Sequence, residues 1–575
     1  MFLLPTDCGQ AHMGLGVVSR IKTEAYDRSK VMDHLSWRSD AVSRLVSTLL
    51  MACLLSAAPA PTANVTGGAV RGYLSAPGAV FKAIPFAAPP LGDLRWREPQ
   101  PVPPWRGVRD ATQYSAACVQ NPLGTGAFLA PLARRYGVDF PTPKWNLSED
   151  CLYLNIWTPE WPVKEPTHAV MFWMHGGSNR IGSGNEPGYD RAELAKHGVL
   201  VVTINYRLGA LGFFAHPELT RESPHRSSGN YGLLDQIAAL RWVHDNIAAF
   251  GGDPARVTVF GESAGAIDAG MLMCSPLARG LFARVIMESG PVLGIAYAHS
   301  LRQAEQFGQR VATRAGAASI QRLRALPAQA ILAAAASAAK QGPNPEFVLD
   351  GWVLARTPQA VFAAGAQQPA GLIIGNNGRE ASVFHGASGA SLPADQGPLK
   401  TLRISYGHLA PVAMAAYVVD THLGRAAAAD EWLNDALMAC PSAAMASLNA
   451  AAGHASFVYR FLRSIPGKGE NELGSFHSLE LPYVFGALHH PAWSWLTFAK
   501  LDEALAAAIQ SYWTNFAKTG DPNGPGLPPW RPFTANSDRY MEFGNDGRAQ
   551  PRQGGRPTFC SLDIPKLKQR LLDNQ

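Results

Sequence analysis

The sequence predicts an α/β protein built on one mixed, mostly parallel β-sheet with helices on both faces. The first observation is that short segments rich in Val, Ile and aromatic residues alternate with segments that carry apolar residues at helical spacing. The second is that the short segments are apolar almost throughout, as strands buried on both faces are. The third is composition: 47% hydrophobic and 16% charged residues suit a large core and argue against disorder.

The expected strands are bounded by Gly, Pro or Asn. They are Tyr153–Trp157, Ala169–Met174, Val199–Asn205, Val257–Phe260, Val285–Met287, Leu372–Ile374 and Phe457–Phe461. Helices are expected between several of them, for example at Leu233–Phe250. Ala-rich segments at about 300–370 and 400–450 predict an inserted helical subdomain. Because no long polar linker interrupts residues 64–575, we interpret them as one large domain.

Residues 1–63 have the features of an N-terminal extension that ends in a secretory signal peptide. The apolar segment Leu45–Ala58 follows two arginines and precedes a run of small residues. Met32 lies at a more usual distance from this segment than Met1 and is the better candidate for the true start. The alternative, a helix of the folded domain, conflicts with the prolines that follow. The expected location is therefore periplasmic or secreted.

Charge and motif content exclude several classes of function. With 50 basic and 44 acidic residues the net charge is +6, and no basic run is interleaved with aromatic residues, so nucleic-acid binding is not expected. Beyond the leader no apolar stretch approaches the roughly 20 residues of a membrane span. No C-x-x-C pair, Cys/His cluster or H-E-x-x-H motif occurs, so no metal is expected.

The strongest signal for chemistry is the segment Gly261-Glu262-Ser263-Ala264-Gly265. It follows the expected strand that ends at Phe260 and opens a helix, which is the context of a nucleophile elbow. In so tight a turn the serine takes strained dihedral angles, and the flanking glycines leave the space that a Cβ would fill. The motif therefore predicts Ser263 as a nucleophile, with a plain glycine-rich turn as the alternative.

A second signal, His175-Gly176-Gly177-Ser178-Asn179, directly follows the expected strand Ala169–Met174. A Gly-Gly pair after a strand allows a sharp turn that exposes successive backbone N–H groups, which would hold an oxyanion if they faced Ser263. An ordinary strand-ending loop is the alternative. The presence of both motifs in this order favours the oxyanion interpretation.

At these motifs the sequence resembles the type-B carboxylesterases, the family that includes the cholinesterases. The similarity covers about residues 64–575 and includes the family-specific segments Phe81–Pro90, Leu94–Trp96, Ser148–Asn155, Asn205–Gly209, Gly229–Gln236 and Phe516–Pro522. The resemblance implies an α/β-hydrolase fold and a serine esterase that cleaves small-molecule esters through an acyl-enzyme, without a cofactor.

The resemblance also implies the other two members of a catalytic triad. The family's acid lies in a segment ending Asp-Glu-Gly, which here reads Arg379-Glu380-Ala381, so Glu380 takes the acid position although both neighbours differ. The family's histidine precedes a glycine, whereas here His477 is followed by Ser478. The order Ser263, Glu380, His477 is the order of this fold.

By the same resemblance the oxyanion donors are the backbone N–H groups of Gly177, Ser178 and Ala264. Arg180 matches a position that lines the family's gorge. Together with basic residues in the loop between residues 118 and 151, Arg180 suggests a substrate that carries free carboxylates in its acyl or alcohol part. Solvated surface charges are the competing interpretation.

Five of the seven cysteines lie after the leader, and an exported chain favours disulfides. The family's pairings match Cys118–Cys151 and Cys440–Cys560, and Cys274 is expected to be a buried free thiol. Glu149 and Arg207 resemble a buried ion pair of the family, so both are expected to be architectural. Two alternative functions stay open: a lipase for insoluble esters, and a catalytically silent relative that serves in adhesion or binding.

Overall fold

A computed structural model describes residues 60–560, with gaps at 122–123, 125, 141–144, 190–192, 295–297, 343, 384–410, 412–413, 416–417, 419–424, 535–536 and 555–559. The leader up to residue 59 lies outside the described residues, so the signal peptide and the start at Met32 stay predictions. The limits of the large domain and of its helical subdomain also stay predictions.

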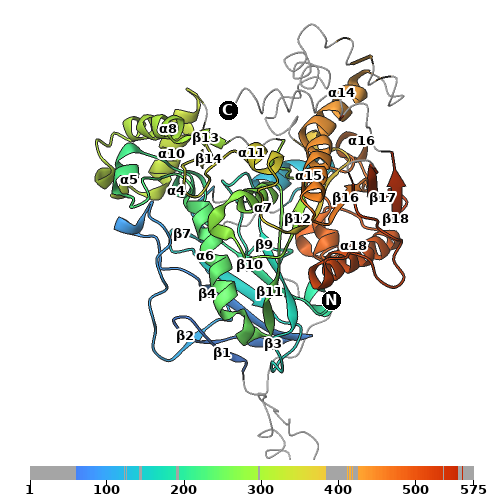
Figure 1. Cartoon of the computed structure of the whole chain (residues 1–575), viewed down its shortest axis with the longest axis horizontal. Helices are drawn as coiled ribbons and strands as arrows, with labels where there is room; N and C mark the ends of the chain where they lie inside the picture. Colours follow the sequence, from blue (N-terminus) through green and yellow to red (C-terminus); the bar gives the residue numbers. More distant parts are fainter. Residues whose placement is uncertain are drawn as a thin grey trace, which may run out of the picture. The chain divides into compact units, whose positions relative to one another are not determined.

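One large twisted sheet organises the described chain (Figure 1). Its strands are β3 (Tyr73–Ser75), β4 (Gly78–Pro85), β8 (Tyr153–Trp157), β9 (His168–Met174), β10 (Leu200–Ile204), β11 (Gly252–Glu262), β12 (Arg284–Glu288), β15 (Gly371–Asn377), β16 (Ser456–Phe461), β17 (Arg539–Phe543) and β18 (Ala549–Gln553). In space the order is β18-β17-β16-β15-β12-β11-β9-β10-β8-β4-β3. The strands from β10 to β17 pair in parallel, and both edges pair antiparallel. The predicted mixed, mostly parallel sheet is confirmed.

All seven expected strand segments coincide with strands of this sheet, and the edge strands were not predicted. The missed strands β17 and β18 are only partly buried, and the last three residues of β18 are exposed. Three smaller sheets are formed by β1 (Thr62–Val65), β2 (Gly68–Arg71) and β5 (Val108–Asp110), by β6 (Ala117–Cys118) and β7 (Leu147–Ser148), and by β13 (Ala298–Ser300) and β14 (Phe347–Leu349).

Both faces of the large sheet are buried, as β9 shows. Successive side chains of a strand point to opposite faces, and along β9 the residues Val170, Phe172 and Met174 enter one core while Met171 and Trp173 enter the other. Helices α6 (Tyr231–Asn246) and α7 (Ala264–Cys274) cover the first face, and α18 (Lys500–Thr519) covers the second. This arrangement explains why the central strands are apolar throughout.

The remaining helices pack around the ends of the sheet. They are α2 (Gly126–Arg135), α3 (Glu193–Lys196), α4 (Gly209–Gly212), α5 (Pro217–Glu222), α8 (Leu301–Arg314), α9 (Ile320–Arg324), α10 (Ala328–Ala339), α11 (Pro358–Ala363), α14 (Arg425–Asn434), α15 (Cys440–Ala451), α16 (Glu470–Leu473) and α17 (Leu481–Val484). The Ala-rich helices α8 and α10 pack together and α10 lies against α4, whereas α15 packs over β15 and β16. Figure 1 shows the pair α8 and α10 well separated from α15.

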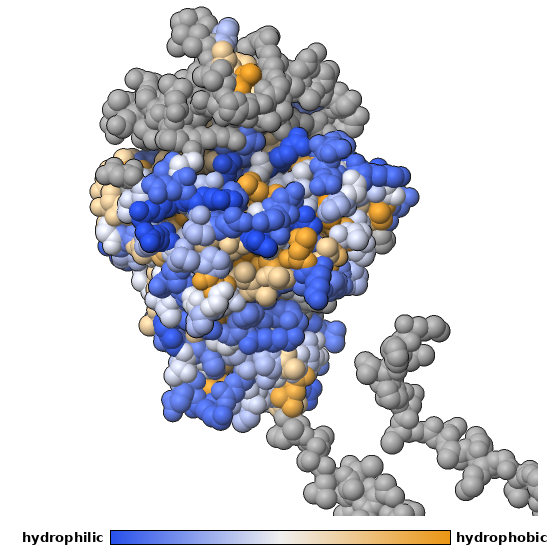
Figure 2. Space-filling view, turned by 90° about the vertical axis from the view of Figure 1, so that its right-hand side faces the viewer, coloured by the Kyte–Doolittle hydropathy of each residue, from blue (hydrophilic) through white to orange (hydrophobic). Residues whose placement is uncertain are grey.

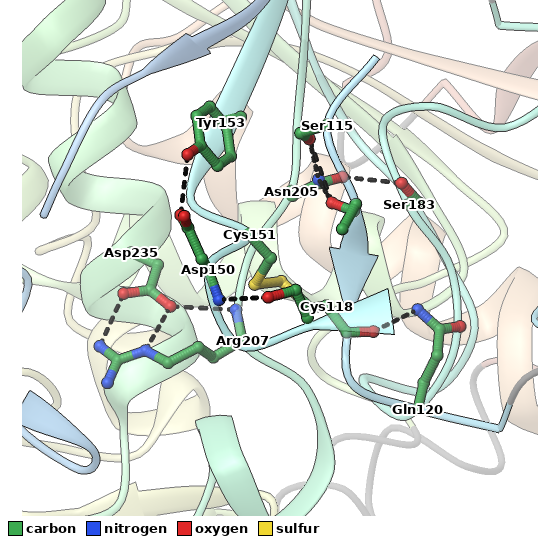
Figure 3. Close-up of a disulfide and its surroundings, with 12 residues drawn as sticks. Ser115, Cys118, Gln120, Asp150, Cys151, Tyr153, Ser183, Asn205, Arg207 and Asp235 are labelled. Carbon is green, nitrogen blue, oxygen red and sulfur yellow. Dashed lines mark hydrogen bonds and ion pairs between the residues drawn. A yellow bond between two sulfur atoms is a disulfide. The ribbon is translucent and has the colours of Figure 1, made fainter. Parts of the chain in front are cut away.

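Two disulfides and two buried ion pairs join segments that are distant in the sequence. Cys118 is joined to Cys151, and Cys440 to Cys560. The expected pair of Glu149 with Arg207 is wrong, because two separate pairs occur instead. Figure 3 shows the pair of Arg207 with Asp235 near the Cys118–Cys151 disulfide. The Arg207 guanidinium binds Asp235 at 2.7 and 2.8 Å, and Glu149 binds Arg95 at 2.5 and 2.7 Å. Both residues are architectural, but each has a different partner.

Hydrophobic side chains on the outer surface occur in small groups. Figure 2 shows such groups among a majority of hydrophilic residues on the face that it presents. The large hydrophobic residues that are exposed among the described residues are Leu74, Leu91, Val108, Val138 and Leu501. They are far apart in sequence, and scattered exposure of this kind is ordinary in a folded protein.

Candidate active site

Ser263 lies in the sharp turn between β11 and α7. Its φ and ψ are 56° and −122°, a strained conformation for a residue with a side chain. The turn fits only because of its glycines: a Cβ on Gly265 would lie 2.0 Å from the carbonyl oxygen of Met174. The Ser263 N–H donates to the carbonyl oxygen of Glu288 at 2.8 Å, which ties the turn to β12. The predicted strand–turn–helix context of Ser263 is therefore present.

Glu380 and His477 form a short buried contact. His477 Nδ1 lies 2.5 Å from Glu380 Oε2, and the two residues are 4% and 1% exposed. The other carboxylate oxygen of Glu380 accepts a hydrogen bond from the Asn377 N–H at 2.6 Å, and the Glu380 N–H donates to Asn434 at 2.9 Å. Glu380 is thus fixed on both sides, and it directs one oxygen at the imidazole.

The residues that flank Glu380 hold its loop although they depart from the family pattern. The Arg379 N–H donates to the carbonyl oxygen of Ser475 at 2.8 Å, and its guanidinium donates to the carbonyl oxygen of Asn471 at 2.9 Å. Ala381 is buried in a small hydrophobic cluster with Trp432. These contacts join the loop after β15 to the segment that carries His477.

A cavity of about 380 Å³ contains both Ser263 and His477 in its wall. Its polar lining also includes Glu262, Ser178 and Arg180. The apolar lining comes from several elements and comprises Ala127, Phe128, Leu129, Ile181, Tyr189, Leu481, Phe485, Ala492 and Trp493. A concave, mostly apolar space with a few polar groups at one end is typical of a small-molecule site.

The loop His175–Asn179 forms one wall of this cavity. Gly177 and Ser178 line the cavity with φ values of 99° and 54°. Ala264 follows Ser263 directly as the first residue of α7. The N–H groups of these three residues therefore belong to the two segments that meet at Ser263.

A buried polar cluster, which was not predicted from the sequence, binds the loop His175–Asn179 through Asn179. Asn179 Nδ2 donates to Asp268 Oδ1 at 2.9 Å and to Glu346 Oε1 at 2.7 Å. Burial raises the pKa of Asp268 to about 8, although its hydrogen bonds from Asn179 and Gln236 lower it. The one available signal was an Asp inside the otherwise apolar helix Ala264–Cys274, since acidic residues are rarely buried without a partner.

His477 is surrounded by carboxylates. Besides Glu380 at Nδ1, Glu262 Oε1 lies 3.1 Å from Nε2. Burial by itself lowers the pKa of His477, but Glu262 and Glu380 outweigh it and raise the pKa above the usual value. Burial also raises the pKa of Glu262, while His477 and Ser478 lower it.

Arg180 and the basic residues of the loop between residues 118 and 151 have different surroundings in the structure. Arg180 lines the cavity and is exposed. Arg135 instead binds Glu472 at 3.2 Å, and Lys144 lies outside the described residues. Asp350 accepts hydrogen bonds from Ser227 and from backbone N–H groups of its own loop. In the described part of the chain, no group of three or more His, Cys, Asp or Glu side chains could hold a metal ion.

Comparison with known proteins matches this geometry to one family. The profile of the Carboxylesterase family matches residues 59–560. Fumonisin B1 esterase of Sphingopyxis macrogoltabida is 35% identical over 88% of this chain and 92% of its own length. Para-nitrobenzyl esterase of Bacillus subtilis is 35% identical over 82% of this chain and 94% of its own length.

Solved structures agree. A PNB esterase superposes with a TM-score of 0.73 at 31% identity, covering 87% of this chain and 98% of that one. The carboxylesterase EST55 of Geobacillus stearothermophilus gives a TM-score of 0.73 at 33% identity, with 87% and 99% covered. At this identity and coverage the fold of most of the chain is similar to that of the solved esterases.

Glu288 provides a test of the buried charges beneath the turn. Burial first and Glu262 second raise the pKa of Glu288 to about 8, while the hydrogen bond from Trp513 lowers it. The folded chain therefore holds a proton that the unfolded chain releases near pH 4.5, and the free energy of unfolding falls as pH rises toward 8. The glutamine of Glu288→Gln cannot ionise, so this loss of stability should be absent from the variant. The unfolding free energy of the variant minus that of the native chain should therefore be about 2–3 kcal/mol larger at pH 9 than at pH 6.

Urea unfolding of both proteins at the two pH values measures this difference. Glu503→Gln, which removes an exposed carboxylate from α18, serves as the control. A Glu288→Gln effect of the same size at both pH values would show that Glu288 is not protonated in the folded chain.

Proposed function

The chain belongs to the carboxylesterase family and is a carboxylic ester hydrolase, and on this premise we propose that Ser263, Glu380 and His477 are its catalytic triad. The observation that carries the assignment is the 2.5 Å contact between His477 Nδ1 and Glu380, with His477 and Ser263 in the wall of one cavity. A base held by a buried acid beside a strained serine is the arrangement that acyl transfer requires.

The mechanism follows from these positions. His477 Nε2 takes the proton of Ser263 Oγ, which attacks the ester carbonyl carbon. The N–H groups of Gly177, Ser178 and Ala264 bind the oxyanion, and His477 then protonates the leaving alcohol. Water, deprotonated by His477, hydrolyses the acyl-enzyme. Glu380 keeps the Nδ1 proton in place and stabilises the imidazolium that forms at each step.

Replacement of the nucleophile tests the triad. Ser263→Ala should lower kcat for p-nitrophenyl butyrate by at least about 10³-fold, because only binding and the oxyanion donors remain. The same variant should no longer be labelled by a serine-directed phosphonate. Ser511→Ala is the matched control, since this hydroxyl donates to the carbonyl oxygen of Ala507 on α18. Near-native turnover by Ser263→Ala with an unchanged circular dichroism spectrum would refute the assignment.

We further propose that the substrate carries a free carboxylate in its acyl or alcohol part. Arg180 is an exposed guanidinium in the wall of the same cavity as Ser263. The acid that interacts with it is Glu346, whose pKa is raised by burial despite Asn179 and Arg180, which lower it. Because Arg180 is exposed in the cavity wall, its guanidinium can bind a substrate carboxylate through paired hydrogen bonds.

Paired substrates test this preference. For p-nitrophenyl hydrogen glutarate against p-nitrophenyl valerate, Arg180→Ala should reduce the ratio of the two kcat/KM values about 10-fold or more. Arg180→Lys keeps the charge and should lose less of the ratio, while Arg134→Ala controls for the removal of a nearby basic residue. An unchanged ratio in Arg180→Ala would dismiss the carboxylate proposal while leaving the triad intact.

We also propose that the chain is exported to the periplasm or the medium after removal of a signal peptide. The two disulfides support this location, because such bonds persist in oxidising compartments. Among the described residues, no helix combines the length and apolar character needed to cross a bilayer. Protein recovered from the periplasm or medium should begin between residues 57 and 64. Full-length protein retained in the cytosol would contradict the proposal.

A further inference from the structure

Ser478, which follows His477, occupies a backbone conformation that favours glycine. Its φ is +72°, and the residue is 8% exposed. A side chain in this left-handed region is strained, whereas a glycine is not. The carboxylesterases that the sequence resembles have glycine at this position, so the strain in this chain has to be offset by something that the side chain does.

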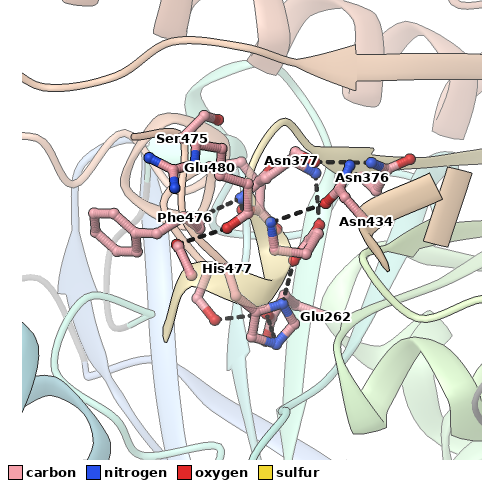
Figure 4. A network of polar contacts seen from close by, with 12 residues as sticks. Glu262, Asn376, Asn377, Asn434, Ser475, Phe476, His477 and Glu480 are labelled. Atoms are coloured by element: carbon pink, nitrogen blue, oxygen red, sulfur yellow. Dashed lines mark hydrogen bonds and ion pairs between the residues drawn. The ribbon is translucent and has the colours of Figure 1, made fainter. Parts of the chain in front are cut away.

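The hydroxyl of Ser478 binds the carboxylate that also contacts the catalytic histidine. Ser478 Oγ donates to Glu262 Oε1 at 2.6 Å. The same Oε1 lies 3.1 Å from His477 Nε2. Because Glu380 occupies Nδ1, Nε2 is the nitrogen that exchanges protons with Ser263 in the proposed mechanism. One oxygen of Glu262 therefore connects Ser478 to the reacting side of the imidazole. Figure 4 shows Glu262 next to His477.

Glu262 has little room to take another position. It immediately precedes Ser263 and is 3% exposed. On the side opposite His477 it abuts the loop of the oxyanion donors: a Cβ on Gly176 would lie 2.6 Å from Glu262 Oε2. The carboxylate is thus confined between this loop and the turn of His477, where the Ser478 hydroxyl determines which way Oε1 points.

The surroundings of Glu262 are rich in buried acids. The titratable groups that interact with it are His477, Glu380, Glu288, Glu480, Tyr189 and Tyr459. Burial and Glu380 favour the neutral form of Glu262, whereas His477 and the Ser478 hydrogen bond favour its charged form. Loss of the hydroxyl therefore shifts Glu262 toward the neutral acid, which no longer supports a positive charge on His477.

We propose that Ser478 is a positioning residue whose hydroxyl keeps the Glu262 carboxylate charged and aimed at His477 Nε2. Glu262 in turn stabilises the imidazolium that forms when His477 takes the proton of Ser263, so the proposal rests on the proposed triad. Ser478 acts only through Glu262, and its effect should therefore appear in the pH dependence of the reaction and disappear when Glu262 has no charge.

The pH profile of kcat/KM for p-nitrophenyl butyrate tests the proposal. The acidic limb reports the titration of the base in the free enzyme. Ser478→Ala should move its midpoint to lower pH by about 0.5–1 unit and reduce kcat about 3- to 10-fold. Glu262→Gln should move the midpoint further in the same direction. Adding Ser478→Ala to Glu262→Gln should produce no additional shift, because the two groups act as one unit.

A second variant separates the hydroxyl from the backbone strain. Ser478→Gly removes the hydroxyl and relieves the strain, and it should shift the profile as much as Ser478→Ala does. Ser511→Ala again serves as the control. An unmoved acidic limb in both Ser478 variants, or a shift that adds to that of Glu262→Gln, would overturn the proposal. Substantial turnover by Ser263→Ala would instead overturn the triad itself, so the two failures are distinguishable.

Discussion

The turn at Ser263 depends on a close approach of backbone segments that leaves no room for side chains. A Cβ on Gly261 would lie 2.6 Å from the backbone of Gly265, and one on Gly290 would lie 2.3 Å from the carbonyl oxygen of Ser263. These contacts exist because β9, β11 and β12 are parallel neighbours whose carboxyl ends meet at one edge of the sheet. The loops after the three strands are thereby brought together, which is where ligand sites occur in sheets of this kind.

Around this turn the chain buries more acids than it has bases to neutralise them. Glu262, Glu288, Glu380 and Glu480 are all at most 3% exposed, and His477 is the basic group among them. A buried carboxylate is costly unless it is paired or protonated. The acids therefore cannot all be ionised together. The Glu380 carboxylate accepts a hydrogen bond from the Asn377 N–H and contacts the imidazole, whereas Glu288 accepts one from Trp513 and has an oxygen without a hydrogen-bond partner among the described residues.

The sequence predicts those features that depend on neighbouring residues. The apolar run that ends at Phe260 and the glycines on either side of Ser263 determine a strand and a sharp turn locally, and both are present. Strands β17 and β18, at one end of the sheet, were missed because they are short, contain charged or polar residues and are only partly buried. The sequence does not predict which residues that are distant in the chain become partners. Glu149 and Arg207 have opposite charges and were expected to pair, yet their actual partners are Arg95 and Asp235. Nothing in the neighbouring sequence distinguishes the expected pair from the observed pairs.

Part of the cavity wall comes from elements outside the large sheet. Phe128 and Leu129 of α2 face the cavity, and the ring of Phe128 lies edge-on to His477 with centroids 6.4 Å apart. The loop that carries them is closed by the Cys118–Cys151 disulfide (Figure 3). Gln120, two residues after Cys118, exchanges two 2.7 Å hydrogen bonds with Gly182, which follows the oxyanion loop in sequence. The loop is also fixed along α2, because Leu132 and Ala133 are buried in the core on the second face of the sheet and Arg135 binds Glu472. The cavity wall therefore combines residues from outside the large sheet, such as Phe128 and Arg180, with Ser263 at the end of a buried strand.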